Sequence, residues 1–313
     1  PVFITIDTEF AHRHFTAGHD VDEIYDRSLE PAGVGLTYQL EMFARHGLKA
    51  CFFVDPMPAM VFGLDPVKRM VDTVLSAGQE VQLHLHPHWT GSREADRSRT
   101  GRFHMHQYTL AEQIELLEGA TDLLVAAGAP NPIAFRAGNY AANDDTLTAL
   151  GATGFSYDSS HNGAHAEIDS RISLPARRIA PSEETVVEVP VTVIEDAPGS
   201  LRTFQLCALS VGEMMAALEH AFEQDHAAVT IVSHGFELAN RSGTSPNGVH
   251  VRRFEALCER LGDRAADLPT THFMDRPTLT MDSTDTPLAP DNLRTRWRQA
   301  EQLWSNWVSE RAA

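Results

Sequence analysis

The chain has 313 residues, of which 42% are hydrophobic and 22% charged, a composition typical of a globular protein with a substantial core. Its formal net charge of −18 argues against a nucleic-acid-binding protein, because phosphate binding requires a basic surface. No stretch of the sequence approaches the ~20 consecutive apolar residues of a membrane span.

The N-terminal segment and the cysteines indicate the compartment. The opening residues, PVFITIDTEF, lack the basic region and apolar run of a signal peptide, so we expect a cytoplasmic protein, although the chain starts with Pro rather than Met. Cys51, Cys207 and Cys258 are widely spaced and form no Cys-x-x-Cys motif. This spacing favours buried, reduced thiols over disulfides or a thiolate metal site.

The first half of the chain alternates between short apolar runs and segments with helical periodicity. Gly residues at the ends of the periodic segments indicate helix termini. We expect strands at 2–7, 49–54, 80–84, 132–138 and 155–160. We expect helices at 34–47, 65–78, 109–128 and 143–154.

The second half is less regular. It contains an extended segment at 185–196 and a strong buried strand at 227–235. A helix over 210–224 starts with Ser210 and Glu213, the two residues of a capping box, and another helix is expected over 250–262.

The alternation of short apolar strands and helices predicts an α/β protein with a parallel sheet or barrel covered by helices. In such folds reactive groups gather at the carboxyl ends of the strands. Five of the predicted strands end in reactive side chains. Each has an ordinary structural explanation by itself, but their joint placement favours a functional site. These residues are Asp7 and Glu9, the histidines of HLHPH, Arg136, Asp158 and His234.

The histidine cluster indicates a metal. Glu9 with two of the histidines His84, His86 and His88 would supply the three imidazole and carboxylate ligands of a catalytic zinc-type site. All three histidines would share one side of a continuing strand, but Pro87 argues against regular continuation. The sequence allows two pairs of histidine ligands: His84 with His88, converging around a turn, or His84 with His86.

The order of six segments resembles that of the polysaccharide deacetylase family, carbohydrate esterase family 4 and its relatives. The segments are ITIDTEF, KACFFV, EVQLHLHPH, AFRAGNY, YDSS and TIVSHGFEL. The resemblance implies a distorted (β/α) barrel of about seven strands over residues 1–275. Residues 276–313 then form a C-terminal extension, a linker followed by a helix, which we expect to pack on the barrel.

The resemblance also implies a ligand set for the metal. Asp7 matches the catalytic base of the family and Glu9 the metal-binding carboxylate, whereas His84 and His88 match its histidine pair. In the common family motif two aspartates are adjacent, but here Thr8 separates the two acids and the second is Glu.

Three further roles follow from the resemblance. Arg136 matches an arginine that orients the base, Asp158 an aspartate that steadies the neighbouring charged groups, and His234 the general acid. The residue after the arginine is usually proline in the family, and here it is Ala137.

The expected activity is therefore metal-dependent removal of an acetyl group from an N-acetylated sugar, such as a cell-surface polysaccharide, an oligosaccharide or a sugar-nucleotide precursor. The expected cofactor is zinc, with nickel, cobalt and manganese as alternatives. One rival hypothesis is hydrolysis of a small non-peptide amide or ureide, and another is a non-catalytic, metal-holding carbohydrate-binding domain. A serine hydrolase is disfavoured, because no Gly-x-Ser-x-Gly stands at a strand-to-helix turn.

The terminal helix carries three tryptophans, Trp297, Trp304 and Trp307, at helical spacing. Aromatic residues so spaced usually pack into a core, so we expect them to dock on the barrel of the same chain rather than on another subunit. The oligomeric state is not predicted.

Overall fold

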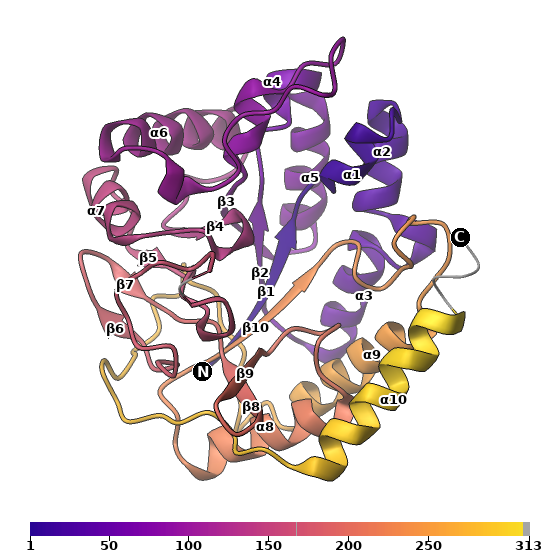
Figure 1. The fold of residues 1–313 in the computed structure, drawn as a ribbon, viewed down its shortest axis with the longest axis vertical. Helices are drawn as coiled ribbons and strands as arrows, with labels where there is room; N and C mark the ends of the chain where they lie inside the picture. The colour runs from indigo at the N-terminus through magenta and orange to yellow at the C-terminus, as the bar shows by residue number, and fades with distance from the viewer. Residues whose placement is uncertain (167, 309–313) are drawn as a thin grey trace.

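The computed structural model describes residues 1–166 and 168–308, and its centre is an eight-stranded sheet in the order β10-β1-β2-β3-β4-β5-β7-β6 (Figure 1). Seven of these strands run parallel, and β6 pairs antiparallel with β7. The strands are β1 (Val2–Thr8), β2 (Ala50–Val54), β3 (Glu80–Leu85), β4 (Ala134–Ala137), β5 (Tyr157–Asp158), β6 (Ser182–Glu183), β7 (Val187–Glu188) and β10 (Val229–His234). The predicted α/β fold with about seven barrel strands is confirmed as a curled, half-barrel sheet.

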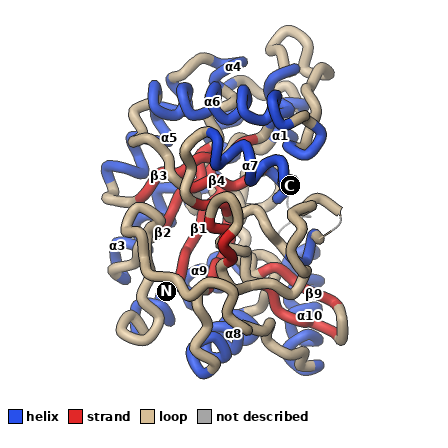
Figure 2. Tube along the Cα trace, turned by 90° about the vertical axis from the view of Figure 1, so that its left-hand side faces the viewer, coloured by secondary structure: helices blue, strands red, loops and turns tan. Residues whose placement is uncertain are grey.

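The open side of the curl is bridged by irregular chain. Val191 bonds through its backbone to His161 beyond β5, and Thr192 bonds to Thr230 in β10. Leu206 then donates its N–H to the carbonyl of Val232 in β10. Between these two stretches the hairpin β8 (Val193–Ala197) and β9 (Ser200–Thr203) projects from the barrel and lies beside α10 (Figure 2).

Strand β1 shows how the sequence separates the two faces of the sheet. Its side chains alternate, so Val2, Ile4 and Ile6 belong to the main core beneath the helices. Phe3 faces the inside of the curl, where it stacks on Phe273 in a small second core. The inner face thus changes from aromatic at the start of the strands to polar at their ends.

The helices cover the outer face of the sheet (Figure 1). Three of them begin with a capping box: Thr109 with Glu112, Asn143 with Thr146 and, as predicted, Ser210 with Glu213. The helices are α1 (His12–Thr16), α2 (Val21–Ser28), α3 (Leu36–His46), α4 (Ala59–Phe62), α5 (Asp65–Ser76), α6 (Leu110–Ala126), α7 (Asp144–Ala152), α8 (Val211–Glu223), α9 (Gly248–Asp263) and α10 (Asn292–Val308). No helix within residues 1–166 and 168–308 is long and apolar enough to cross a membrane.

The extended segment predicted over 185–196 forms two strands instead of one. β7 ends at Glu188 and β8 begins at Val193, with Pro190 between them. Proline has no N–H to contribute to a strand ladder, which explains the interruption. The three cysteines are free thiols, as expected.

Helix α10 follows a stretch, residues 276–291, without helix or strand, and it lies against α8, α9 and β8 (Figure 1). Its inward face is polar. The buried Arg298 bonds to Asp196 in β8 and to Glu213 in α8, at 2.9 and 3.0 Å. The expectation for the tryptophans is wrong, because all three indoles are exposed. Residues 309–313 of the predicted extension lie outside the described residues.

Replacing Arg298 by Ala should lower the free energy of unfolding of the region around α10 by about 3 kcal/mol, because Glu213 would keep a buried charge without a cation and Asp196 would keep only its pair with Arg202. Urea unfolding followed by circular dichroism and limited proteolysis near residue 290 measure the loss. The control is Arg294→Ala, because Arg294 is partly exposed and 3.9 Å from Asp291, and this change should cost no more than about 0.5 kcal/mol. Equal losses in the two variants would contradict the buried-pair explanation.

Candidate functional site

A cavity of about 190 Å³ opens at the carboxyl ends of the parallel strands, where the sequence predicted the reactive groups to gather. Five of the predicted site residues line it. Its lining consists of Asp7, Glu9, His84, His86, Asn139, Tyr140, His165, Asp169, Gln205 and His234.

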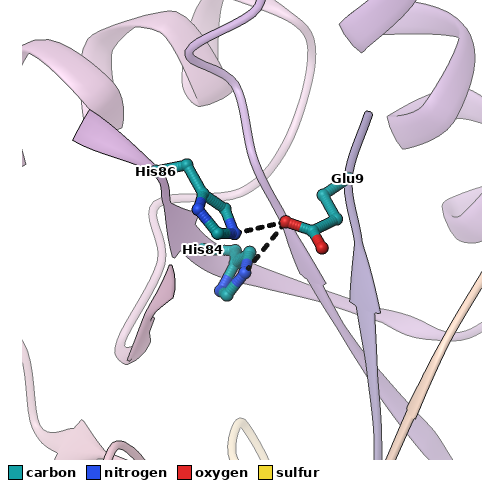
Figure 3. A group of neighbouring side chains, drawn as sticks. All are labelled: Glu9, His84 and His86. Carbon is teal, nitrogen blue, oxygen red and sulfur yellow. Dashed lines mark ion pairs between the residues drawn. The ribbon is translucent and has the colours of Figure 1, made fainter. Parts of the chain in front are cut away.

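Glu9, His84 and His86 form the one group in the described part of the chain with three ligand atoms suited to a metal ion (Figure 3). These atoms lie within 4.8 Å of one another. Oε2 of Glu9 is 3.6 Å from Nε2 of His84 and contacts Nε2 of His86 directly. Two imidazoles and a carboxylate are a donor set that zinc accepts in catalytic sites.

The surroundings fix the orientation of both imidazoles. Nδ1 of His84 donates a hydrogen bond of 2.8 Å to the carbonyl oxygen of Arg136, which leaves Nε2 free to act as a ligand. The ring of His86 lies against Gly138, where the Cβ of any larger residue would come within 2.4 Å of Nδ1. The glycine after β4 is therefore required for the position of His86.

The structure groups His84 with His86 rather than with His88, the partner that the resemblance implied. His86 keeps an extended backbone and follows β3 directly, so its side chain points to the same side as that of His84. A 3₁₀ turn begins at Pro87, and His88 within it does not belong to the group of close ligand atoms. There the buried ring of His88 packs against Trp89 and Phe103, and burial lowers its pKa to about 2.

Asp7 is held by a buried arginine. Nη1 of Arg136 donates to Oδ1 of Asp7 and to Oγ1 of Thr5, both at 2.8 Å. The other side of the guanidinium bonds to the carbonyl and hydroxyl oxygens of Ser159 at 3.0 Å. Burial alone would raise the pKa of Asp7, but Arg136, with His84 and His234, outweighs burial and lowers it, so the carboxylate is ionised.

His234 lies across the cavity from the metal ligands, with its Nε2 3.8 Å from Oδ2 of Asp7. Its Nδ1 is 3.1 Å from Oε1 of Glu237, and Oε2 of this buried glutamate accepts a 3.0 Å bond from Ser233. Burial alone would lower the pKa of His234, but Glu237 and Asp7 outweigh burial and raise it to about 9. The imidazole is thus protonated at neutral pH.

The sequence analysis did not find Glu237. The only available signal was a glutamate three residues after a histidine at a strand end, in SHGFE. Gln205, which also bonds to Glu237, was not predicted either, because its position depends on the chain segment that bridges β10 and β5.

Asp158 lies behind the cavity wall, so it is a buried supporting residue. Its Oδ1 accepts a 2.7 Å bond from Ser160, whose own oxygen accepts the N–H of Ala137 at 2.9 Å. The partner of Arg136 on this strand end is Ser159 rather than Asp158. Burial and the neighbouring Asp158 raise the pKa of Glu188 well above its usual range.

Asn139 and Tyr140 form the part of the cavity wall that follows β4. Both have a φ of 58°, in the left-handed region that residues other than glycine seldom adopt. The hydroxyl of Tyr140 is buried, with no hydrogen-bond partner in the described residues. Consecutive backbone strain of this kind is found mostly at functional sites.

No protein-family model matches the sequence, and no curated protein matches it. Several solved structures match the fold. A protein assigned as a polysaccharide deacetylase from Mycobacterium smegmatis is 18% identical, with a TM-score of 0.52 over 90% of this chain and 94% of that chain. The 4-alpha-glucanotransferase from Thermococcus litoralis is 11% identical, with a TM-score of 0.52 over 90% of this chain and 42% of that chain.

A family 4 carbohydrate esterase from Streptomyces lividans, solved in complex with acetate, is 14% identical. Its TM-score is 0.44 over 93% of this chain and 97% of that chain. The comparison with the Mycobacterium smegmatis structure supports a conclusion about the fold. The chain has the fold seen in the polysaccharide deacetylases, as the order of its motifs indicated.

Proposed function

We propose that the chain is a metal-dependent hydrolase that removes an acetyl group from an N-acetylated sugar. The observation that carries the proposal is the placing of Glu9, His84 and His86 in one cavity with an ionised Asp7 and a protonated His234. Metal-assisted hydrolysis of an amide uses these three elements: a cation, a base and an acid.

The donor set fits zinc. One carboxylate and two correctly oriented imidazoles face a solvent-connected cavity, which leaves room for further ligands. A zinc ion held there would polarise the acyl carbonyl and lower the pKa of a water molecule in the cavity.

The protein groups supply the proton transfers. Asp7 takes the proton of the attacking water, and Arg136 keeps Asp7 ionised and oriented through their charge-assisted hydrogen bond. His234 gives its proton to the amine nitrogen as the carbon–nitrogen bond breaks. Glu237 holds Nδ1 of His234, so that Nε2 faces Asp7 and the cavity. The products are acetate and an amino sugar.

The second candidate function is hydrolysis of a small amide or ureide, and the small size of the cavity is compatible with it. About 190 Å³ is less than the ~300–1,000 Å³ of pockets that enclose drug-sized ligands. The cavity therefore suits either one sugar residue or a small amide. The non-catalytic alternative is disfavoured, because the neighbours of Asp7 keep it ionised and those of His234 keep it protonated, as a base and an acid require.

Acetate release from N-acetylhexosamines, short N-acetylated oligosaccharides and sugar nucleotides, compared with ammonia release from small amides, tests the proposal. We expect acetate release that a chelator abolishes and zinc restores. Asp7→Asn should lower kcat at least about 100-fold while zinc stays bound, because only the base is removed. Release of ammonia without acetate would select the amide hydrolase, and full activity of Asp7→Asn would remove Asp7 as the base.

Zinc content identifies the histidine ligands. After reconstitution, His84→Ala and His86→Ala should each bind zinc at least about tenfold more weakly, whereas His88→Ala should keep the wild-type stoichiometry. Mass spectrometry of bound metal measures the content, and circular dichroism checks that each variant is folded. Loss of zinc in His88→Ala with retention in His86→Ala would restore the His84–His88 pair.

The pH profile tests the link between Glu237 and His234. His234 acts in its protonated form, so the rate should fall as pH rises through its pKa of about 9. Glu237→Gln removes the charge that raises this pKa, so the alkaline limb should move at least about one pH unit lower and kcat should fall about tenfold. Glu255→Gln, a change of an exposed glutamate bonded to Tyr38, is the matched control. An unmoved alkaline limb in Glu237→Gln would contradict the assignment.

A further inference from the structure

Helix α10 presents an apolar stripe to solvent. Six large hydrophobic side chains on this helix are exposed, half of those so exposed in the described part of the chain. The α10 stripe consists of Leu293 (79% exposed), Trp297 (65%), Leu303 (72%), Trp304 (59%), Trp307 (56%) and Val308 (44%). Single exposed apolar residues are ordinary, but a contiguous set marks an interaction site.

The spacing of the α10 stripe is that of a helix-packing seam. Leu293, Trp297, Trp304 and Trp307 are separated by four, seven and three residues, so they fall on one side of the helix. The rings of Trp304 and Trp307 are in contact, with centroids 5.7 Å apart. The exposed Arg296, three residues after Leu293, is a charged neighbour of the stripe.

The helix cannot turn this stripe inward. Arg298 on the opposite side is held by Asp196 and Glu213, and Glu301 pairs with Arg253 at 2.9 Å. Ser305 is buried and bonds to Asn247. A rotation of α10 would break these buried pairs and leave Glu213 without a cation, so the stripe is a fixed feature of the surface.

The area of the α10 stripe matches that of a dimer interface. With about 250 Å² for a whole aromatic side chain, the three indoles leave on the order of 450 Å² in solvent. The three aliphatic side chains add roughly 200 Å². A symmetric pair would therefore bury on the order of 1,300 Å², within the ~1,200–2,000 Å² of stable interfaces.

We propose that α10 is the dimerisation element of this protein and that its stripe packs against the same stripe of a second copy. A two-fold interface places a surface against itself, which a stripe of apolar side chains allows even in a chain of net charge −18. The same charge opposes docking on an anionic membrane. An antiparallel pair with its axis beside Ala300 sets Trp297 of one copy against Trp304 of the other.

Sedimentation velocity of the full chain between about 1 and about 100 µM tests the proposal. Wild type should sediment with the mass of two chains, and Trp304→Glu should be monomeric, with a dimer Kd at least 100-fold higher. Gln299→Glu, an exposed position on α10 outside the stripe, adds the same charge and should stay dimeric. Mild oxidation of Ala300→Cys should yield a covalent dimer, since the two-fold axis passes beside this residue.

A monomeric wild type at about 100 µM would overturn the proposal, and its binding to phosphatidylcholine vesicles would assign the stripe to a membrane surface instead. A dimer that persists in Trp304→Glu would also overturn it, because the interface would lie elsewhere. None of these measurements uses catalytic activity, so their outcome is independent of the proposed hydrolase function.

Discussion

The buried guanidinium of Arg136 is the constraint on which the interior of the barrel depends. A charge without access to water needs a partner for nearly every N–H, and here the partners come from β1 and from the end of β5. Below the guanidinium lies the ring of Phe53, with its centroid 4.5 Å away. The inner face must therefore turn polar at this level, and Asp7 above it must remain a carboxylate.

The alternation of strands and helices, and with it the edge of the sheet where reactive groups meet, could be predicted because both follow from hydrophobic periodicity. The ligand set could not be settled in the same way. The choice between His86 and His88 depends on whether one residue before Pro87 stays extended, and on the space left by Gly138 in a different strand. The local sequence pattern carries no signal for a contact such as that between His86 and Gly138, which follow different strands.

The hydrogen-bond partners of His234 and Arg136 were not predicted either. Glu237 reaches His234 because the chain turns back after β10, and Ser159 rather than Asp158 meets Arg136 because of where β5 ends. In α10 the periodicity correctly indicated a helix with one apolar side, but periodicity does not tell which side faces the protein. The buried ion pairs of Arg298 hold the polar side of α10 against the protein, so the tryptophans face the solvent.

The sheet order has a consequence for synthesis of the chain. β1 lies between β2, about fifty residues later, and β10, whose register pairs Val2 with Val229. When the chain emerges in order, β1 can pair with β2 early, but its other edge has no partner until residues 229–234 have been made. An open edge is prone to pairing with other chains, so the strand that carries Asp7 needs protection during most of translation.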